Sequence, residues 1–448
     1  MRHANRTPGA RALLLGLATI AGSAATATAA GRAEEVRPRF PDVLLVTVDT
    51  LRADHLSSSG YPRPTSPNID ALLASGFRFT VARTVEPLTN PALASLLTSV
   101  PPHVHGATRN GLPARAGLAS LPRLLAKRGY RTAAFLGNWT LKDHLSGLAG
   151  HWQTYEVVTS RKRWLGLVKD EAHAEDLSAE AIDWVEELRE EEPDRPFLLW
   201  LHYVEPHAPY RLHEQHAERF GIDPRHPTAI DRYDTEIAAV DAEIGRLLAE
   251  LDRLAGGRDR LTVFHVDHGE AFGENGEVGH GRLLHAPTLH VPLGFAGAGR
   301  VPPGESAAAV TTLDVAPTVL SLLGLGVHPY FRGRDLVPAM NGGELAGALP
   351  CFQAHRGAVQ SVHRADRARR AGLLEIGHLD GGRIEVLHVG RDDQRRAQLA
   401  AGGRGEASPR LAECVEEIRA GLAEHDRFVP PELDAETVEQ LRALGYLD

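Results

Sequence analysis

The chain has 448 residues, of which 43% are hydrophobic and 24% charged, and its formal net charge is −9. This length is enough for one large α/β domain and a smaller one, with the composition of an ordinary globular protein. The acidic balance excludes an extended basic surface, so we expect no nucleic-acid partner. Cys351 and Cys414 are the only cysteines, so at most one disulfide can form, and metal binding by thiolates is not expected.

The first thirty residues are typical of a secretory signal. Three arginines precede an apolar stretch at 12–20, and the small-residue tract AGSAATATAA follows it. This order matches a charged start, an apolar centre and an A-x-A-like cleavage region; cleavage after 25–27 and after 27–29 both fit. We therefore expect export to the periplasm or the medium. The alternative is an uncleaved membrane anchor, for which the apolar stretch is short, and no later segment resembles a transmembrane helix.

Strands and helices alternate along the next three hundred residues. The run DVLLVTVD at 42–49 is apolar almost throughout, as expected for a strand buried on both faces. Further strands are predicted at 130–136, 196–204 and 261–267, helices at 68–76, 121–129, 174–192 and 229–255, and a strand-turn-helix unit at 309–324. This alternation predicts an α/β fold with a mostly parallel sheet covered by helices on both faces.

The sequence pattern changes after about residue 345, where short stretches alternate between apolar and polar residues. The alternating stretches LLEIGHL and RIEVLHV are joined by Asp380, Gly381 and Gly382, which predicts a small antiparallel sheet with a hairpin turn. Residues 435–447 are predicted to form a terminal helix.

Two aspartates directly follow apolar strands: Asp49 after the first and Asp267 after LTVFHV. Ligands of parallel sheets bind at the carboxyl ends of the strands. A carboxylate buried there without a partner is costly, so a metal ion or another cation is the natural explanation. His268 adds an imidazole nitrogen, which tilts an oxygen-rich site from calcium toward zinc or manganese. The alternative for Asp49 alone is a helix cap.

The segment VEPLTNPALASLLTSVPPHVHG at 85–106 places a hydroxyl, Thr89, where a short helix over 92–98 begins. Pro91 suits the first helical turn, and the free backbone N–H groups of a helix start stabilise anions. Taken alone, the pattern favours Thr89 as a helix N-cap.

Histidines form a second group of candidates. His207 lies in HYVEPHAPY, where a strand runs into a proline-rich loop, and His280 lies in the GHG of a glycine-rich loop. Histidines in loops beyond strand ends are candidates for general acid catalysis or for anion contact.

Five segments, in chain order, resemble the sulfatase family of the alkaline-phosphatase-like superfamily. They are DVLLVTVDTLRADHLSSSGYPRPTSPNIDALLASGFRFTVA, PLTNPALASLLTSVPPHVHG, HYVEPHAPY, VDHGEAFGENGEVGHG and LDVAPTVLSLLG. The resemblance identifies residues 41–340 as a sulfatase-like catalytic domain, after a signal peptide at 1–30, with 345–448 as a small C-terminal α+β subdomain. It implies a central mixed sheet flanked by helices, a smaller C-terminal sheet and one divalent metal ion.

The resemblance also assigns roles to residues. It places Thr89 at the position of the nucleophile, and Asp49, Asp267 and His268 at metal-ligand positions. His207 falls on the histidine that faces the ester, and His280 falls where a basic residue contacts sulfate.

Some positions depart from the family pattern. Thr89 cannot become formylglycine, because its β-carbon carries a methyl group. Leu93 replaces an arginine, Thr50 replaces a second metal-binding aspartate, and Asn138 and Thr140 replace a lysine and a histidine. Phosphoethanolamine transferases and nucleotide pyrophosphatases of the same superfamily instead use a metal-bound threonine, and Asp49, Thr89, Asp267 and His268 resemble their ligand set.

We therefore expect an exported hydrolase with one divalent ion (calcium, zinc or manganese), held by Asp49, Thr89, Asp267 and His268. It would cleave a sulfate or phosphate ester through attack by Thr89, whose hydroxyl the ion activates, with His207 and His280 assisting. The alternatives are a phosphoryl-group transferase or phosphodiesterase, and a binding protein that keeps the fold without turnover.

Overall fold

The computed structural model describes residues 40–158, 173–346, 352–354, 358–366, 371–378, 384–389, 413–414, 416–421 and 433–443. The predicted signal segment, Cys351 and the turn around Asp380 lie outside these residues. Cys414 is buried and disulfide-bonded. In the part of the chain that is described, no helix is both long and apolar enough to cross a membrane.

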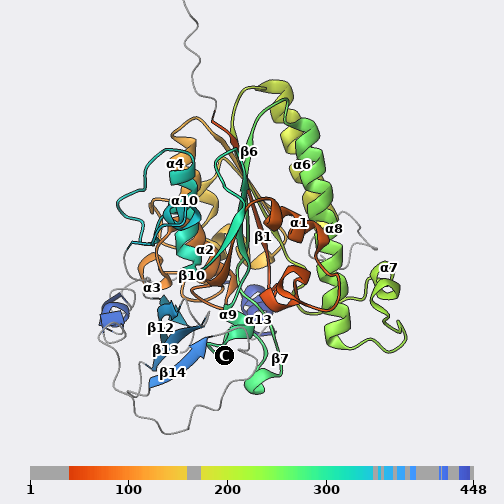
Figure 1. Cartoon of the computed structure of the whole chain (residues 1–448), viewed down its shortest axis with the longest axis vertical. Coiled ribbons are helices and arrows are strands. Elements are labelled where there is room, and N and C mark those ends of the chain that lie inside the picture. The colour runs from red at the N-terminus through yellow and green to blue at the C-terminus, as the bar shows by residue number, and fades with distance from the viewer. Residues whose placement is uncertain are drawn as a thin grey trace, which may run out of the picture. The chain divides into compact units, whose positions relative to one another are not determined.

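An eight-stranded sheet forms the centre of the fold (Figure 1). Its spatial order is β10-β2-β9-β6-β1-β5-β3-β4. The strands are β1 (Asp42–Val48), β2 (Phe77–Arg83), β3 (Arg131–Leu136), β4 (Thr154–Val157), β5 (Phe197–Tyr203), β6 (Arg260–Val266), β9 (Leu293–Gly297) and β10 (Gly304–Thr311). Only β9 among them runs antiparallel to its neighbours. The predicted mixed, mostly parallel sheet is confirmed.

Helices cover both faces of this sheet, and alternate residues of β1 explain why. Leu44, Val46 and Val48 pack into the apolar cluster of α1 (Pro67–Ser75), α6 (Ala174–Glu191) and α8 (Ala229–Leu254). Val43 and Leu45 point the other way, into the cluster of α2 (Thr89–Thr98), α4 (Leu121–Ala126) and α10 (Val315–Leu322). Because side chains alternate across a strand, the unbroken apolar run of β1 feeds both layers. Figure 1 shows α6 and α8 on one side of the sheet and α4 and α10 on the other.

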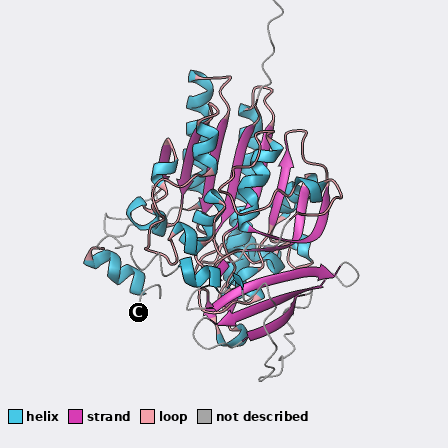
Figure 2. Cartoon of the chain, turned by 90° about the vertical axis from the view of Figure 1, so that its left-hand side faces the viewer, coloured by secondary structure: helices cyan, strands magenta, loops and turns pink. Residues whose placement is uncertain are grey.

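Short elements complete the described chain. They are α3 (Pro102–His105), α5 (Asp143–Ser146), α7 (Glu214–Ala217), α9 (Ala286–Leu289), α11 (Val337–Met340), α13 (Ala435–Ala443) and the hairpin strands β7 (Ala271–Phe272) and β8 (Val278–Gly279). The predicted antiparallel sheet is confirmed as β11 (Phe352–Ala354), β12 (Ala358–Asp366), β13 (Ala371–His378) and β14 (Ile384–Val389), in that spatial order (Figure 2). The terminal helix is also confirmed, as α13.

Register brings the polar strand ends together. β1 lies between β5 and β6 and is parallel to both, with Val48 opposite Tyr203 on one side and Val266 on the other. The next residues, Asp49 and Asp267, therefore leave the sheet side by side at its carboxyl edge.

Candidate functional site

Asp49 and Asp267 are both fully buried at this edge. Asp49 Oδ2 accepts a 2.6 Å hydrogen bond from Asn138 Nδ2, and the Asn138 amide is itself oriented by Thr140, whose backbone N–H and hydroxyl both donate to Asn138 Oδ1. Asp267 Oδ1 accepts from the backbone N–H groups of Thr50, at 3.2 Å, and His268, at 2.7 Å. Each carboxylate thus has one oxygen fixed by the protein.

The second oxygen of each carboxylate has no hydrogen-bond partner within the described residues. These atoms are Asp49 Oδ1 and Asp267 Oδ2, and both lie close to His268 Nε2, at 3.7 and 3.6 Å. Burial and the Asp49 charge raise the pKa of Asp267 well above its usual range. Burial opposes ionisation of Asp49 as well, but His202 and its neighbouring histidines hold the pKa of Asp49 below its usual range. Two buried carboxylates so close together repel each other when both are ionised, and a bound cation would offset this repulsion.

His268 presents a lone pair to this space. Its Nδ1 lies 3.1 Å from the Gly269 carbonyl oxygen, which can only accept, so the proton is on Nδ1 and Nε2 is free to bind a metal. Burial lowers the pKa of His268 to about 4, so the ring is neutral at physiological pH. Thr89 Oγ1 lies 3.5 Å from the same Nε2.

His202, near the end of β5, faces Asp49 from the other side. Its Nε2 lies 3.5 Å from Asp49 Oδ2. The Thr47 hydroxyl donates to the Leu201 carbonyl and lies 2.9 Å from His202 Nδ1. A hydroxyl has one proton, so the neutral His202 ring carries its proton on Nδ1 and its Nε2 can bind a metal. The protonated ring instead donates to Asp49, and this form lowers the pKa of Asp49. Ligand atoms of Asp49, His202 and Asp267 all lie within 4.8 Å of one another, a spacing that fits one divalent ion.

Thr89 is not the helix N-cap that the isolated segment favours. It is the first residue of α2 and fully buried, Leu88 occupies the N-cap position, and the Thr89 hydroxyl lies toward His268. The Asn90 N–H of this helix start donates to Asn110 Oδ1. Leu93, one turn further, packs in the apolar cluster beneath the sheet, so this helix brings a hydroxyl and no cation to the site.

His207 and His280 face each other across the site, with their Nε2 atoms 3.4 Å apart. His207 Nδ1 lies 2.7 Å from the Ala208 carbonyl oxygen and His280 Nδ1 lies 3.0 Å from that of Pro87. Both Nδ1 atoms therefore donate, and the two Nε2 atoms can hydrogen-bond to each other only when one of them is protonated. The His280 ring also lies 4.2 Å from the His268 ring, centroid to centroid, and burial, His268 and His207 together lower its pKa well below the usual value.

Thr50 has an unusual backbone next to Asp49. Its φ is +55°, in the left-handed region that β-branched residues rarely adopt. Such a conformation costs about 1–3 kcal/mol and persists where neighbouring contacts enforce it. The N–H of this same residue donates to Asp267 Oδ1.

The structure thus gathers all the predicted site residues, Asp49, Thr89, Asp267, His268, His207 and His280, at one edge of the sheet. The sequence analysis did not predict that His202 lies among them. Its position at the carboxyl end of a predicted strand, five residues before His207, is the signal that could have identified it.

Comparison with known proteins agrees with this geometry. The family model described as Sulfatase matches residues 41–325. Among curated proteins, the chain is 27% identical to an uncharacterized sulfatase, YidJ, of Escherichia coli K12, over 40% of this chain and 41% of that protein. It is 26% identical to an N-acetylglucosamine-6-O-sulfatase of Bacteroides thetaiotaomicron, over 43% of this chain and 36% of that protein. The matched segments thus span less than half the length of these two relatives.

A solved structure, Ps i-CgsB in complex with k-i-k-neocarrahexaose, has a TM-score of 0.66 at 18% identity. The match covers 90% of this chain and 97% of that one, and at this identity it establishes the fold alone. Because the family model spans well over half of the chain, and its span includes every site residue described above, the protein belongs to the sulfatase family.

Proposed function

We propose that this protein is a metal-dependent hydrolase that cleaves a sulfuric ester through attack by the Thr89 hydroxyl. The observation that carries the proposal is the position of His268 Nε2, 3.5 Å from Thr89 Oγ1 and within 3.7 Å of both buried carboxylates. The Thr89 hydroxyl, the two neighbouring carboxylates and the His268 lone pair thus lie in one buried space, as in sites that activate a hydroxyl.

Asp49, Thr89, Asp267 and His268 would hold one divalent ion, and the geometry adds His202 to this set. The orphaned oxygens of Asp49 and Asp267 and the free Nε2 of His202 support the assignment. When bound, a divalent ion lowers the pKa of a neighbouring hydroxyl and offsets carboxylate charge. The mixture of carboxylate and imidazole ligands suits zinc or manganese better than calcium.

His207 and His280 would share one proton and deliver it to the leaving group. The Thr89 oxygen forms a bond to sulfur, the bond from sulfur to the leaving oxygen breaks, and that oxygen takes the proton of the pair. The hydroxyl proton of Thr89 is released to solvent. Water then hydrolyses the sulfated threonine, returning one proton to the histidine pair and releasing sulfate. The sum is one ester and one water converted to an alcohol, sulfate and a proton.

The charges at the site favour esters with a single negative charge. Two carboxylates are buried there, and Leu93 and Asn138 stand where the family pattern has cations. A sulfate monoester and a phosphodiester each carry one charge, whereas a phosphate monoester carries nearly two at neutral pH. The second candidate function is therefore cleavage or transfer of a phosphodiester, which the unmodified threonine nucleophile favours. Among sulfate esters, the names of the relatives make sulfated sugars the first substrates to examine.

We also propose that the protein is exported. The charged and apolar order of residues 1–30 supports this, as does the disulfide at Cys414, because disulfides persist in oxidising compartments.

Metal content tests the ligand assignment. We expect one divalent ion per chain in the purified protein, and chelation should lower its melting temperature, because the repulsion between Asp49 and Asp267 returns. Asp267→Asn should retain less than about a tenth of the metal, by elemental analysis. Asp241→Asn is the matched control, since Asp241 is equally buried but binds the amides at the start of α1. A wild-type protein without metal and without a metal-dependent melting shift would favour the binding-protein alternative.

Thr89→Ala tests the nucleophile. We expect kcat/KM to fall at least about a thousandfold on the preferred substrate, because the attacking oxygen is removed. The panel should contain aryl sulfate, sulfated sugar, phosphodiester and phosphate monoester, each measured with several metals. Thr98→Ala, on the same helix and with its hydroxyl donating to the Ala94 carbonyl, should keep wild-type activity. Full activity of Thr89→Ala contradicts the assignment, and a preference for the phosphodiester selects the second candidate.

Leaving-group dependence tests the histidine pair. His207→Ala should lose roughly a hundredfold or more in kcat on alkyl esters and far less on nitrophenyl esters, because an acidic phenol leaves without protonation. His226→Ala, an exposed histidine, is the control. Equal losses on both ester types would exclude the acid role of His207.

N-terminal sequencing of the protein recovered from the periplasm or medium tests export. We expect the mature chain to begin shortly after residue 27 or 29, because small residues occupy both cleavage positions. An intact N-terminus in the cytoplasmic fraction is the contrary result.

A further inference from the structure

Hydrogen bonds of the loop after β1 orient the Asp267 carboxylate toward the proposed metal site. Thr50 donates its N–H to Asp267 Oδ1, and with the His268 N–H it occupies that oxygen, so Oδ2 is the one left for a ligand. The left-handed φ of Thr50 sets the angle between this donating peptide and the Thr50 carbonyl that follows it. A threonine returns to an extended or helical conformation unless other contacts prevent it.

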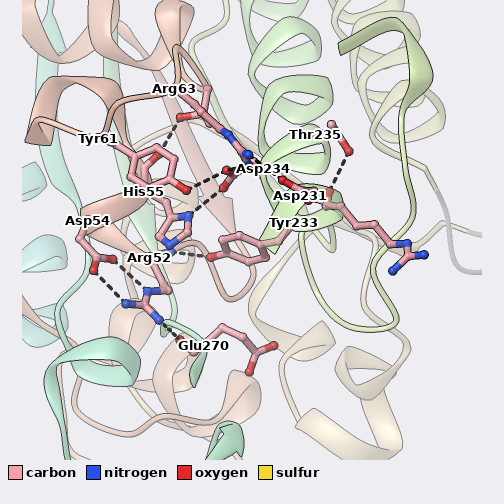
Figure 3. Close-up of polar contacts among 12 residues, drawn as sticks. Arg52, Asp54, His55, Tyr61, Arg63, Asp231, Tyr233, Asp234, Thr235 and Glu270 are labelled. Atoms are coloured by element: carbon pink, nitrogen blue, oxygen red, sulfur yellow. Dashed lines mark hydrogen bonds and ion pairs between the residues drawn. The ribbon is translucent and has the colours of Figure 1, made fainter. Parts of the chain in front are cut away.

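The hydroxyl of Tyr233 makes those contacts. It donates to the Thr50 carbonyl oxygen at 2.7 Å and accepts from the Arg52 N–H at 2.8 Å. One hydroxyl thus bridges both sides of the loop and satisfies two buried backbone groups. The Arg52 guanidinium extends the link, donating to the Glu270 carbonyl oxygen at 3.1 Å, on the loop that follows His268 (Figure 3).

The Tyr233 ring is held in place from several sides. It lies fully buried in the second turn of α8. The ring centroids of His55, Tyr210 and Phe272 lie 5.2, 5.5 and 4.9 Å away, all nearly perpendicular to it. A ring packed in this way cannot follow the loop if the loop relaxes, so the hydroxyl acts as a fixed point.

We propose that Tyr233 is a positioning residue of the metal site, which holds Thr50 in its left-handed conformation and so orients Asp267. The inference rests on the proposed metal dependence and goes beyond it, because the Tyr233 hydroxyl hydrogen-bonds to the backbone of Thr50 and Arg52 and not to a proposed ligand. Its hydroxyl acts through a backbone and a hydrogen bond, so its loss affects metal affinity first.

Tyr233→Phe removes this hydroxyl alone. We expect the dissociation constant for the added ion (Mn²⁺, Zn²⁺ or Ca²⁺, each titrated by thermal shift) to rise about 10- to 100-fold, as for other residues that orient ligands. At saturating metal, kcat should return to within a few fold of wild type, since no group that touches substrate has changed.

Tyr130→Phe is the matched control. Tyr130 is also fully buried, and its hydroxyl donates to a backbone carbonyl, that of Pro41, at the opposite end of β1. We expect it to lower the melting temperature of the metal-free protein about as much as Tyr233→Phe does, while metal affinity changes less than about twofold. Equal metal affinity in Tyr233→Phe and wild type overturns the inference, as does equal weakening in both variants.

Thr50→Gly provides a rescue. Glycine adopts a left-handed φ without strain, so Tyr233→Phe should weaken metal binding less in this background than in the Thr50 protein. An undiminished effect in the Thr50→Gly background contradicts the mechanism. A wild type that binds no metal would overturn the proposed metal dependence and this inference with it, whereas normal metal binding by Tyr233→Phe overturns the inference alone.

Discussion

The rest of the site depends on two buried carboxylates, those of Asp49 and Asp267, which lie next to each other. Asp49 and Asp267 are fully buried because β1 and β6 deliver them in register to the same edge. Neighbouring groups donate hydrogen bonds to one oxygen of each carboxylate: Asn138 donates to Asp49, and two backbone amides donate to Asp267. The His268 ring turns a lone pair, not a proton, toward the other oxygens. These donors carry no full positive charge that would balance the carboxylates, which is why we propose a cation at this place.

Much of the fold could be predicted because its central strands are buried on both faces. The runs that became β1, β5 and β6 are apolar almost without interruption, and the helices between them have clear periodicity. The strands β10, β2 and β9, on one side of the sheet, were harder to predict from the sequence. Strand β9 is five residues long, contains two glycines and runs antiparallel, so neither length nor alternation reveals it. Helix α4 ends at Ala126 rather than at Gly129, a boundary that packing decides.

The site shows the same division. Asp49 and Asp267 could be predicted because each is a charged residue that ends an apolar strand. Thr89 was ambiguous, since a hydroxyl at a helix start serves equally as a cap; its place inside α2 and its distance to His268 argue against the cap. The contributions of His202 and Tyr233 depend on register and on the packing of α8. Neither follows from a local pattern, because the partner of each hydrogen bond lies more than 150 residues away in the chain.

The same separation has a consequence for how the molecule matures. Thr50 and Asp267 are 217 residues apart, and β5, which lies between them in the chain, pairs with β1 on the side opposite β6. Proteins that are dominated by contacts between residues so distant in sequence fold slowly. A nascent or misfolded chain therefore offers no complete set of ligands, and a cation that binds only the finished site stabilises only the finished sheet. The proposed metal site is therefore complete only when the strands of the central sheet have paired.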